Sequence, residues 1–429
     1  MTTVAVEAPT ERQARTRNRL RIALLIAGLM LVTLSFVREV TSATDLTSSG
    51  TFGATLRGAM PLLLAGLGGL YAERAGIVNI GLEGMMIMGT WFGAWAGWHF
   101  GAWPGVFAGL LGGAAGGLIH AVATVTFDIN HIVSGVAINI LAAGVTRFLS
   151  VVAYSNVPGA GVTQSPPVKG NIPHFNVPIL AGGKIFGWHS PDVFGWFERR
   201  HWFLISDTGA LAKGLTSSVS WLTVAAVALV PITFWLLWRT AFGLRLRSVG
   251  EHPVAAESLG VPVYTMKYVA VVISGALAGL GGAFLVVEEA GIYREGQTAG
   301  RGFIALAALI FGNWRPAGVM AGAGLFGYAD ALQLRSPNAI HALLLFIAIA
   351  LTFAAGWFFF RRRVLNSVVL GALAAGIYAW FFASNSVPGD FVTITPYVVT
   401  LLVLAIAAQR LRPPAADGRP YRKGQQVEV

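Results

Sequence analysis

Cysteine is absent from this chain of 429 residues, so the sequence predicts neither a disulfide nor a thiolate metal site. Charge is scarce as well, since charged residues make up 11% of the chain, against the roughly 25% usual in soluble domains. Apolar residues reach 55%, and the mean hydropathy is +0.66. A soluble fold could not hide so much apolar surface, whereas lipid accepts it. We therefore predict a protein embedded in a membrane, in contact with lipid.

Catalytic motifs are missing too. A phosphate-binding loop needs the pattern G-x-x-x-x-G-K-[ST], and the nearest stretch, Gly182-Gly183-Lys184-Ile185, lacks the first glycine and the final hydroxyl. No Ser/His/Asp arrangement, no H-E-x-x-H pattern and no pair of acids on one helix stands out, and His189 and His201 are not spaced as a metal pair. We expect no ATP hydrolysis by this chain, no other enzymatic activity, no metal and no cofactor.

Long apolar runs are abundant, and a helix needs about 17–25 such residues to cross a bilayer. They lie at 20–37, 54–71, 81–99, 104–126, 132–153, 217–238, 268–287, 302–312, 316–334, 340–360, 364–382 and 393–409. The run at 302–312 is too short to cross as a straight helix and predicts a half-helix or a re-entrant piece. The expected fold class is all-α, a polytopic transmembrane helical bundle of about 10–12 membrane segments over residues 20–409.

The placement of the basic residues behind the net charge of +11 indicates membrane topology rather than nucleic-acid binding. With twelve crossings and the N-terminus inside, 19 of the 30 basic residues fall in inner segments. Five of the remainder lie in the long outer loop 154–216, which the positive-inside rule largely exempts. We therefore expect a multi-pass protein of the inner (plasma) membrane, with a basic cytoplasmic N-terminus (1–19), a cytoplasmic tail (410–429) and no nucleic-acid partner.

The first apolar run also resembles a cleavable signal, because the Arg-rich residues 11–21 precede it. Ser42-Ala43-Thr44 is a poor substitute for a cleavage site, so we favour an uncleaved first span. The outer loop 154–216 combines prolines with aromatic and charged residues, which suits the membrane interface. Docking of a protein that delivers substrate is the alternative. The polar tail 410–429 predicts a solvated segment.

Glycine recurs at intervals of four residues within several of these runs. The repeats are Gly89, Gly93 and Gly97, then Gly109, Gly113 and Gly117, then Gly275 with Gly279 and Gly318 with Gly322. Such spacing lines one face of a membrane helix with small side chains and predicts close helix packing. Room for a solute path is the alternative interpretation.

The stretch 71–89 gathers polar residues between the second and third runs. Glu73 and Arg74 stand at the inner end of the second run. Asn79 is placed to cap the third helix, and Glu83 falls one turn later, where the helix dipole favours a carboxylate. A role at the cytoplasmic mouth of a transport pathway is the alternative.

The inner loop 239–267 contains the second polar stretch, from Gly250 to Gly260. Pro253 suits the first position of a helix and Gly260 the position just after its end, so we expect about two helical turns. Ala255, Ala256 and Leu259 give this helix an apolar patch. A helix of seven residues is unstable alone in water, so it needs support from the rest of the protein or from a partner.

Both stretches carry a resemblance. Residues 73–86 resemble the signature of bacterial ATP-binding-cassette (ABC) importer permeases of the branched-chain amino acid and simple-sugar superfamily, most similar to its simple-sugar or nucleoside branch. Residues 250–260, 274–279, 302–312, 329–334 and 414–421 resemble the same superfamily. The fold implied is that of a type II ABC-importer-like permease. Residues 336–392 depart from the pattern and are expected to be an insertion with extra spans.

The resemblance implies partners and site residues. The partners are ABC ATPase subunits, a second homologous permease, an extracytoplasmic substrate-binding lipoprotein and a small polar solute. The residues expected to couple to the ATPase are Glu251, His252, Pro253, Ala255, Ala256, Leu259 and Gly260. The residues expected along the translocation pathway are Asn79, Glu83, Ser134, Asn139 and Phe303.

The function expected is therefore import of a simple sugar or a nucleoside, energised by separate ATPase subunits. One alternative is an ion-coupled secondary transporter of the major-facilitator type, since residues 69–76 faintly resemble the G-x-x-x-D-R-x-G loop of that fold. The basic residues that should follow are replaced by Ile77 and Val78. A branched-chain amino acid ABC permease is the other alternative.

Overall fold

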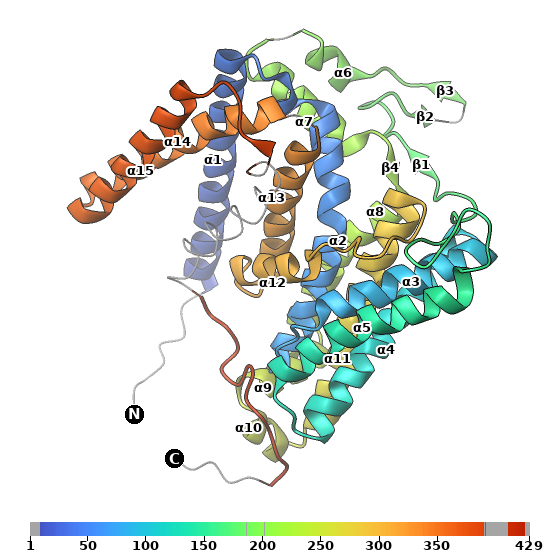
Figure 1. Ribbon diagram of the computed structural model, residues 1–429. Helices are drawn as coiled ribbons and strands as arrows, with labels where there is room; N and C mark the ends of the chain where they lie inside the picture. Colours follow the sequence, from blue (N-terminus) through green and yellow to red (C-terminus); the bar gives the residue numbers. More distant parts are fainter. Residues whose placement is uncertain are drawn as a thin grey trace. The chain divides into compact units, whose positions relative to one another are not determined.

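The computed structural model describes residues 9–185, 187–200, 202–335, 337–389, 391 and 411–424, and these are predominantly helical (Figure 1). The chain divides into two compact units. Unit 1 comprises residues 1–52, 178–216 and 332–393, and unit 2 comprises 53–177, 217–331 and 394–429. The last predicted span, 393–409, lies outside the described residues.

Unit 1 holds α1 (Pro9–Thr41), the 3-10 helix η1 (Thr44–Thr47), α6 (Val193–Glu198), α7 (Ile205–Thr216), α14 (Pro337–Phe360), α15 (Val364–Ala383) and the hairpin of β2 (Lys184–Ile185) with β3 (Trp188–His189). The helices α14 and α15 form an antiparallel pair, and they cover the two spans expected in 336–392. Residues 154–216, which we expected to form an outer loop, contain two helices, α6 and α7, that the sequence did not predict.

Unit 2 holds the larger set of helices. In chain order they are α2 (Ser49–Arg74, from Gly53 on), α3 (Leu82–Phe100), α4 (Ala102–Ala121), α5 (His131–Tyr154), α8 (Trp221–Arg239), α9 (Ala241–Glu251), α10 (Pro253–Ser258), α11 (Val263–Phe284), α12 (Arg301–Phe311) and α13 (Pro316–Arg335, to Ala331). The π-helical turns η2 (Val122–Thr126) and η3 (Leu285–Ala290) extend α4 and α11, and β1 (His174–Phe175) pairs with β4 (Val219–Ser220).

Every apolar run predicted within the described residues coincides with one of these helices. Among the described residues, six helices are long and apolar enough to cross a membrane, and they lie at 102–126, 131–154, 221–239, 263–290, 339–360 and 364–383. The run at 302–312 is the short helix α12, as its length required. The structure is thus the polytopic helical protein that the composition predicts.

Glycine allows the core of unit 2 to pack backbone against backbone. A Cβ on Gly279 of α11 would lie 2.4 Å from the Gly109 carbonyl oxygen of α4, and one on Gly89 of α3 would lie 2.2 Å from the Gly279 oxygen. The helices α3, α4 and α11 pack against one another at this crossing. The four-residue glycine spacing therefore serves close packing, as predicted.

The tail segment 411–424 corrects an expectation. We expected a solvated segment, yet Ala416 and Tyr421 are 7% and 8% exposed. The amide of Ala416 donates a hydrogen bond to the Gly250 carbonyl, with 2.9 Å between N and O. Apolar side chains and backbone hydrogen bonds thus attach a segment whose overall composition is polar.

Candidate functional site

The start of α3 brings together most of the residues proposed for a pathway. Asn79 is fully buried, and its amide nitrogen donates to Ser274 Oγ of α11 at 2.9 Å. The N-cap of α3 is Gly81, with no side-chain hydrogen bond. Our expectation that Asn79 caps this helix is therefore wrong, because its side chain turns toward α11 instead.

Asn139 of α5 supplies the polar contacts at this helix end. Its Oδ1 accepts from the Gly84 amide (2.7 Å), and its Nδ2 donates to the Ile80 carbonyl (3.1 Å). The first amides of a helix lack partners within the helix, so a side chain from a neighbouring helix can satisfy them. Asn139 thereby joins α5 to the beginning of α3.

Glu83 lies in the first turn of α3 and is 7% exposed. Its carboxylate accepts hydrogen bonds from Thr298 Oγ1 (2.6 Å) and from the amides of Gly300 (2.9 Å) and Gly302 (2.6 Å). These groups form the N-terminal end of α12, where unpaired amides and the helix dipole favour an anion. Glu83 therefore caps α12 from the neighbouring helix α3.

Ser134 and Phe303 complete the proposed pathway residues. Ser134 Oγ lies 2.8 Å from Nδ1 of the buried His120, whose Nε2 lies 3.2 Å from the Val78 carbonyl oxygen. Phe303 is 48% exposed on α12. The polar members of this set are thus engaged in hydrogen bonds between helices, and Phe303 stands apart from them on an exposed surface.

Sequence reasoning missed two charged contacts of the same unit. Arg301, at the start of α12, pairs with Asp330 of α13 at 3.0 Å. Glu73 accepts a hydrogen bond from the Trp314 indole, and Arg74 Nη2 donates to the Trp314 carbonyl at 2.7 Å. Charged residues within or beside apolar runs indicated that such contacts exist. The sequence could not show which residues they contact, because the partners lie far away along the chain.

The short helix expected in the loop 239–267 is α10. Pro253 is its first residue, and the His252 side chain caps it by accepting a hydrogen bond from the Ala255 amide at 3.3 Å. This end of the helix therefore matches the prediction, with proline where no amide donor is needed.

The other end of α10 is closed by two backbone hydrogen bonds. The Gly260 amide donates to the Glu257 carbonyl (2.8 Å), and the Val261 amide donates to the Ala256 carbonyl (3.0 Å). Together they form a Schellman motif, which needs a left-handed residue, and Gly260 has a φ of +79°. Gly260 is thus the helix stop that the sequence indicated.

The two sides of α10 differ in exposure. Glu251, His252 and Ala255 are exposed, and the Leu259 side chain is 84% exposed. Ala256, which we expected in the patch that faces a partner, is instead 3% exposed and packs against this chain's own residues. The apolar group that remains available to a partner is therefore Leu259, with Ala255 beside it.

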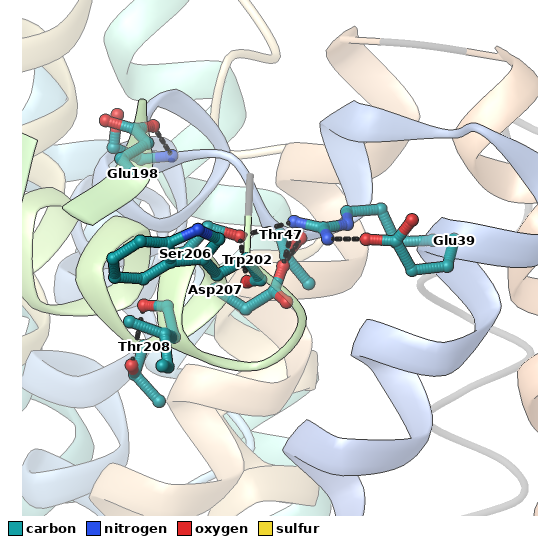
Figure 2. Close-up of polar contacts among 10 residues, drawn as sticks. Glu39, Thr47, Glu198, Trp202, Ser206, Asp207 and Thr208 are labelled. Carbon is teal, nitrogen blue, oxygen red and sulfur yellow. Dashed lines mark hydrogen bonds and ion pairs between the residues drawn. The ribbon is translucent and has the colours of Figure 1, made fainter. Parts of the chain in front are cut away.

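In unit 1, a buried ion pair ties α7 to the end of α1. Asp207 is fully buried and accepts hydrogen bonds from Arg38 Nη1 (2.8 Å) and from the Thr47 hydroxyl (Figure 2). Arg38 also donates to Ser206 Oγ at 2.9 Å. Figure 2 shows Trp202 beside this cluster, and the Trp202 side chain is 48% exposed. The outer loop thus rests on α1 and leaves aromatic surface uncovered.

A comparison with known families decides between the interpretations of this helical protein. The model of a family described as "branched-chain amino acid transport system / permease component" matches residues 51–355. The chain belongs to this permease family. No solved structure matches the chain with significance.

Three curated relatives show which members of the permease family are similar. The guanosine ABC transporter permease protein NupQ of Bacillus subtilis (strain 168) is 34% identical, over 86% of this chain and 96% of its own. The nucleoside ABC transporter permease protein NupC of Lactococcus lactis subsp. cremoris (strain MG1363) is 32% identical, over 85% and 93%. The putative glucose ABC transporter permease protein TsgC13 of Haloferax volcanii is 35% identical, over 69% and 80%.

The predicted ABC permease is thereby confirmed, as a multi-pass membrane protein and a transport component. The major-facilitator alternative finds no support in these relatives. The three relatives also give no support for a branched-chain amino acid as the solute, because none of them is named for one.

Proposed function

We propose that this permease imports a nucleoside, and that separate ATPase subunits supply the energy through α10. The observation that carries the solute class is the extent of the similarity. NupQ and NupC, named for guanosine and nucleosides, match over 86% and 85% of this chain, whereas the putative glucose permease matches over 69%. A simple sugar is the second candidate, because that relative reaches 35% identity.

The coupling assignment rests on the shape of α10. The helix is fixed at both ends by caps, its inner side is covered by this chain, and Leu259 projects from its end. A large apolar side chain that is 84% exposed at the end of a rigid element suits an anchor for a partner's groove. We propose that this partner is the ATPase.

The remaining partners and the orientation belong to the same proposal. A second permease of the family and an extracytoplasmic substrate-binding lipoprotein complete the transporter, with the latter docking on the outer loop 154–216. Both termini face the cytoplasm of the cell, which the distribution of 19 basic residues over the inner segments supports. The solute passes through unit 2, near the residues at the start of α3.

Uptake into vesicles tests the solute and the energy source together. The permease, its ATPase and its binding lipoprotein are assembled in proteoliposomes, and entry of labelled guanosine and labelled glucose is followed with and without ATP. We expect ATP-dependent entry of guanosine that unlabelled nucleosides compete away. Entry that does not depend on ATP and follows a proton gradient would refute the proposal. Competition by glucose alone would show that the solute is a simple sugar and not a nucleoside.

The substitution Leu259→Glu tests the coupling site. Because the side chain is exposed, we expect the permease to fold as the unchanged protein does, yet to lose copurification with its ATPase and ATP-driven uptake. The matched control is Leu244→Glu, the same change at a 63% exposed leucine of α9. Equal loss in both variants, or in neither, would show that Leu259 is not the anchor.

A further inference from the structure

The tail segment 411–424, called the tail brace below, makes contacts that neither the transport assignment nor the resemblance explains. Four segments of unit 2 touch it, namely the loops after α2, η2 and α12 and the end of α9. All four are inner segments in the topology predicted from charge. Figure 1 shows the dark red C-terminal stretch running beside α9 and α10.

The strongest contacts are with the coupling helix itself. Tyr421 is 8% exposed and forms one apolar cluster with Val249, Ala256 and Val263. Its hydroxyl donates a hydrogen bond to the carboxylate of Glu257. The tyrosine thus covers the inner side of α10, and its hydroxyl ties it to a residue of the same helix.

The contact matters because α10 has only six residues. Isolated helices far below about 12 residues do not hold together in water, since nucleation is costly and few hydrogen bonds follow it. The caps satisfy the ends of α10, but the inner side needs an apolar surface. Tyr421 is the part of that surface that comes from outside the stretch 249–266.

Other contacts fasten the brace along its length. Besides the hydrogen bond from Ala416 to Gly250, the Ala415 amide donates to Glu251 Oε2 at 3.2 Å. The Arg412 amide donates to Asn313 Oδ1 at 2.9 Å, after α12. The first two contacts hold the brace at the end of α9, just before α10, and the third holds it at the loop after α12.

Two further contacts join the brace to the ends of the helices that surround the start of α3. Gly76, with a φ of +80°, leaves only 3.1 Å between a Cβ at that position and the Ala416 oxygen. Arg422 Nε lies 2.8 Å from Asp128 Oδ2, in the loop before α5. A displacement of α10 would therefore be passed on to the loops after α2 and before α5.

The turn at Asp417 buries a carboxylate among other charges. Lys267 of α11 and Arg74 at the end of α2 lie near it as cations, and Glu73 lies near it as a second acid. Burial raises the pKa of the Asp417 carboxyl to about 7. The binding of the brace to the rest of unit 2 thus depends on whether Asp417 in its turn is protonated.

We propose that the tail brace is part of the coupling apparatus, which holds α10 in the shape that the ATPase engages and links it to the inner loops of unit 2. This inference rests on the proposed coupling role of α10. It assigns a positioning role to Tyr421, which acts through α10, whereas Leu259 would touch the ATPase directly.

Three variants of the assembled transporter test the brace in proteoliposomes. We expect Tyr421→Ala to lower ATP-driven uptake by about tenfold or more, because the inner side of α10 loses its cover. We expect Tyr421→Phe, which loses only the hydrogen bond to Glu257, to lower it about threefold. Arg419→Ala, at an exposed position of the same segment, serves as the control and keeps full uptake.

A rescue experiment separates the brace from a general effect on folding. The permease is made without residues 411–429 and supplied on the cytoplasmic face with the peptide LRPPAADGRPYRKG, which is the sequence of the brace. We expect the peptide to restore ATPase binding and uptake, and the same peptide with alanine at the tyrosine to fail. If the truncated permease does not fold, uptake by the full-length Tyr421→Ala variant decides whether the brace acts in coupling.

The outcomes separate this inference from the proposed function. Loss of uptake in Leu259→Glu with full uptake in both Tyr421 variants would overturn the brace and leave the coupling helix intact. Full uptake in Leu259→Glu would refute the coupling role of α10, and the proposed role of the tail brace would then be refuted as well. The result expected is reduced uptake in Leu259→Glu, Tyr421→Ala and Tyr421→Phe, with Arg419→Ala unaffected.

Discussion

The replacement of Glu83 separates a structural role from a role in the solute pathway. Its carboxylate accepts three hydrogen bonds at the N-terminal end of α12 and is 7% exposed. Hydrogen bonds to a charged group contribute about 1.5–3 kcal/mol each. A carboxylate at a helix N-terminus adds about 1 kcal/mol. Since these contributions overlap, we expect Glu83→Ala to destabilise the folded permease by about 3–5 kcal/mol.

The assay compares stability with transport. Purified Glu83→Ala, Glu83→Gln and unchanged permease are heated in detergent, and we expect the apparent melting temperature of the alanine variant to fall by about 3–6 °C. Glu83→Gln retains one carbonyl oxygen and should lie between the two. Glu295→Gln is the matched control, because Glu295 pairs with Arg147 on the surface, where an ion pair contributes about 0–1 kcal/mol.

Uptake by the folded fraction then shows whether Glu83 belongs to the pathway. A capping residue changes the amount of folded permease but leaves the KM for the solute as it was. If Glu83→Ala melts like the unchanged protein while its KM rises, Glu83 contacts the solute and the capping argument is wrong.

Three more predictions follow from the packing and the charges. Gly279→Val should prevent stable folding, because its side chain would collide with the α4 backbone, whereas Gly144→Val, which has open space around it, should fold normally; size-exclusion chromatography in detergent measures both. Burial raises the pKa of the Asp417 carboxyl to about 7 when the brace is seated, so seating takes up a proton and should strengthen as the pH falls from 8 to 6. Binding of the brace peptide to the truncated permease measures this, and an unchanged slope in a peptide with asparagine at Asp417 would contradict it. Asp207→Asn should lower the melting temperature of the permease in detergent, because Arg38 loses its buried charged partner and keeps only the half-exposed Glu39.

The sequence predicts the local features of this fold well. Apolar runs located the helices because their length is set by the bilayer, and proline and glycine at 253 and 260 marked the ends of α10 because both residues restrict the backbone in known ways. The glycine spacing predicted close helix packing, and Gly279 shows why, since a Cβ would meet the backbone of α4.

The sequence does not predict which way a side chain turns. Asn79 is a residue type that often caps helices, and it stands just before α3. Its side chain instead donates a hydrogen bond to Ser274, which lies 195 residues away in the sequence. Likewise Ala255 and Ala256 look alike in the sequence, and the packing of Val249, Val263 and Tyr421 in one cluster with Ala256 shows which of the two alanines is buried. Such contacts depend on how distant segments meet, and no periodic pattern in one sequence records that.

The cover over α10 is also made late. Tyr421 follows Glu257 by 164 residues, so at about 5–20 residues per second it is synthesised roughly 10–30 s after the helix it supports. During that interval Ala256 lacks its aromatic neighbour, and six residues cannot hold a helix on their own. An unfinished permease therefore lacks the aromatic cover of α10 until synthesis has passed residue 421, and the proposed docking of an ATPase on this helix would follow that point.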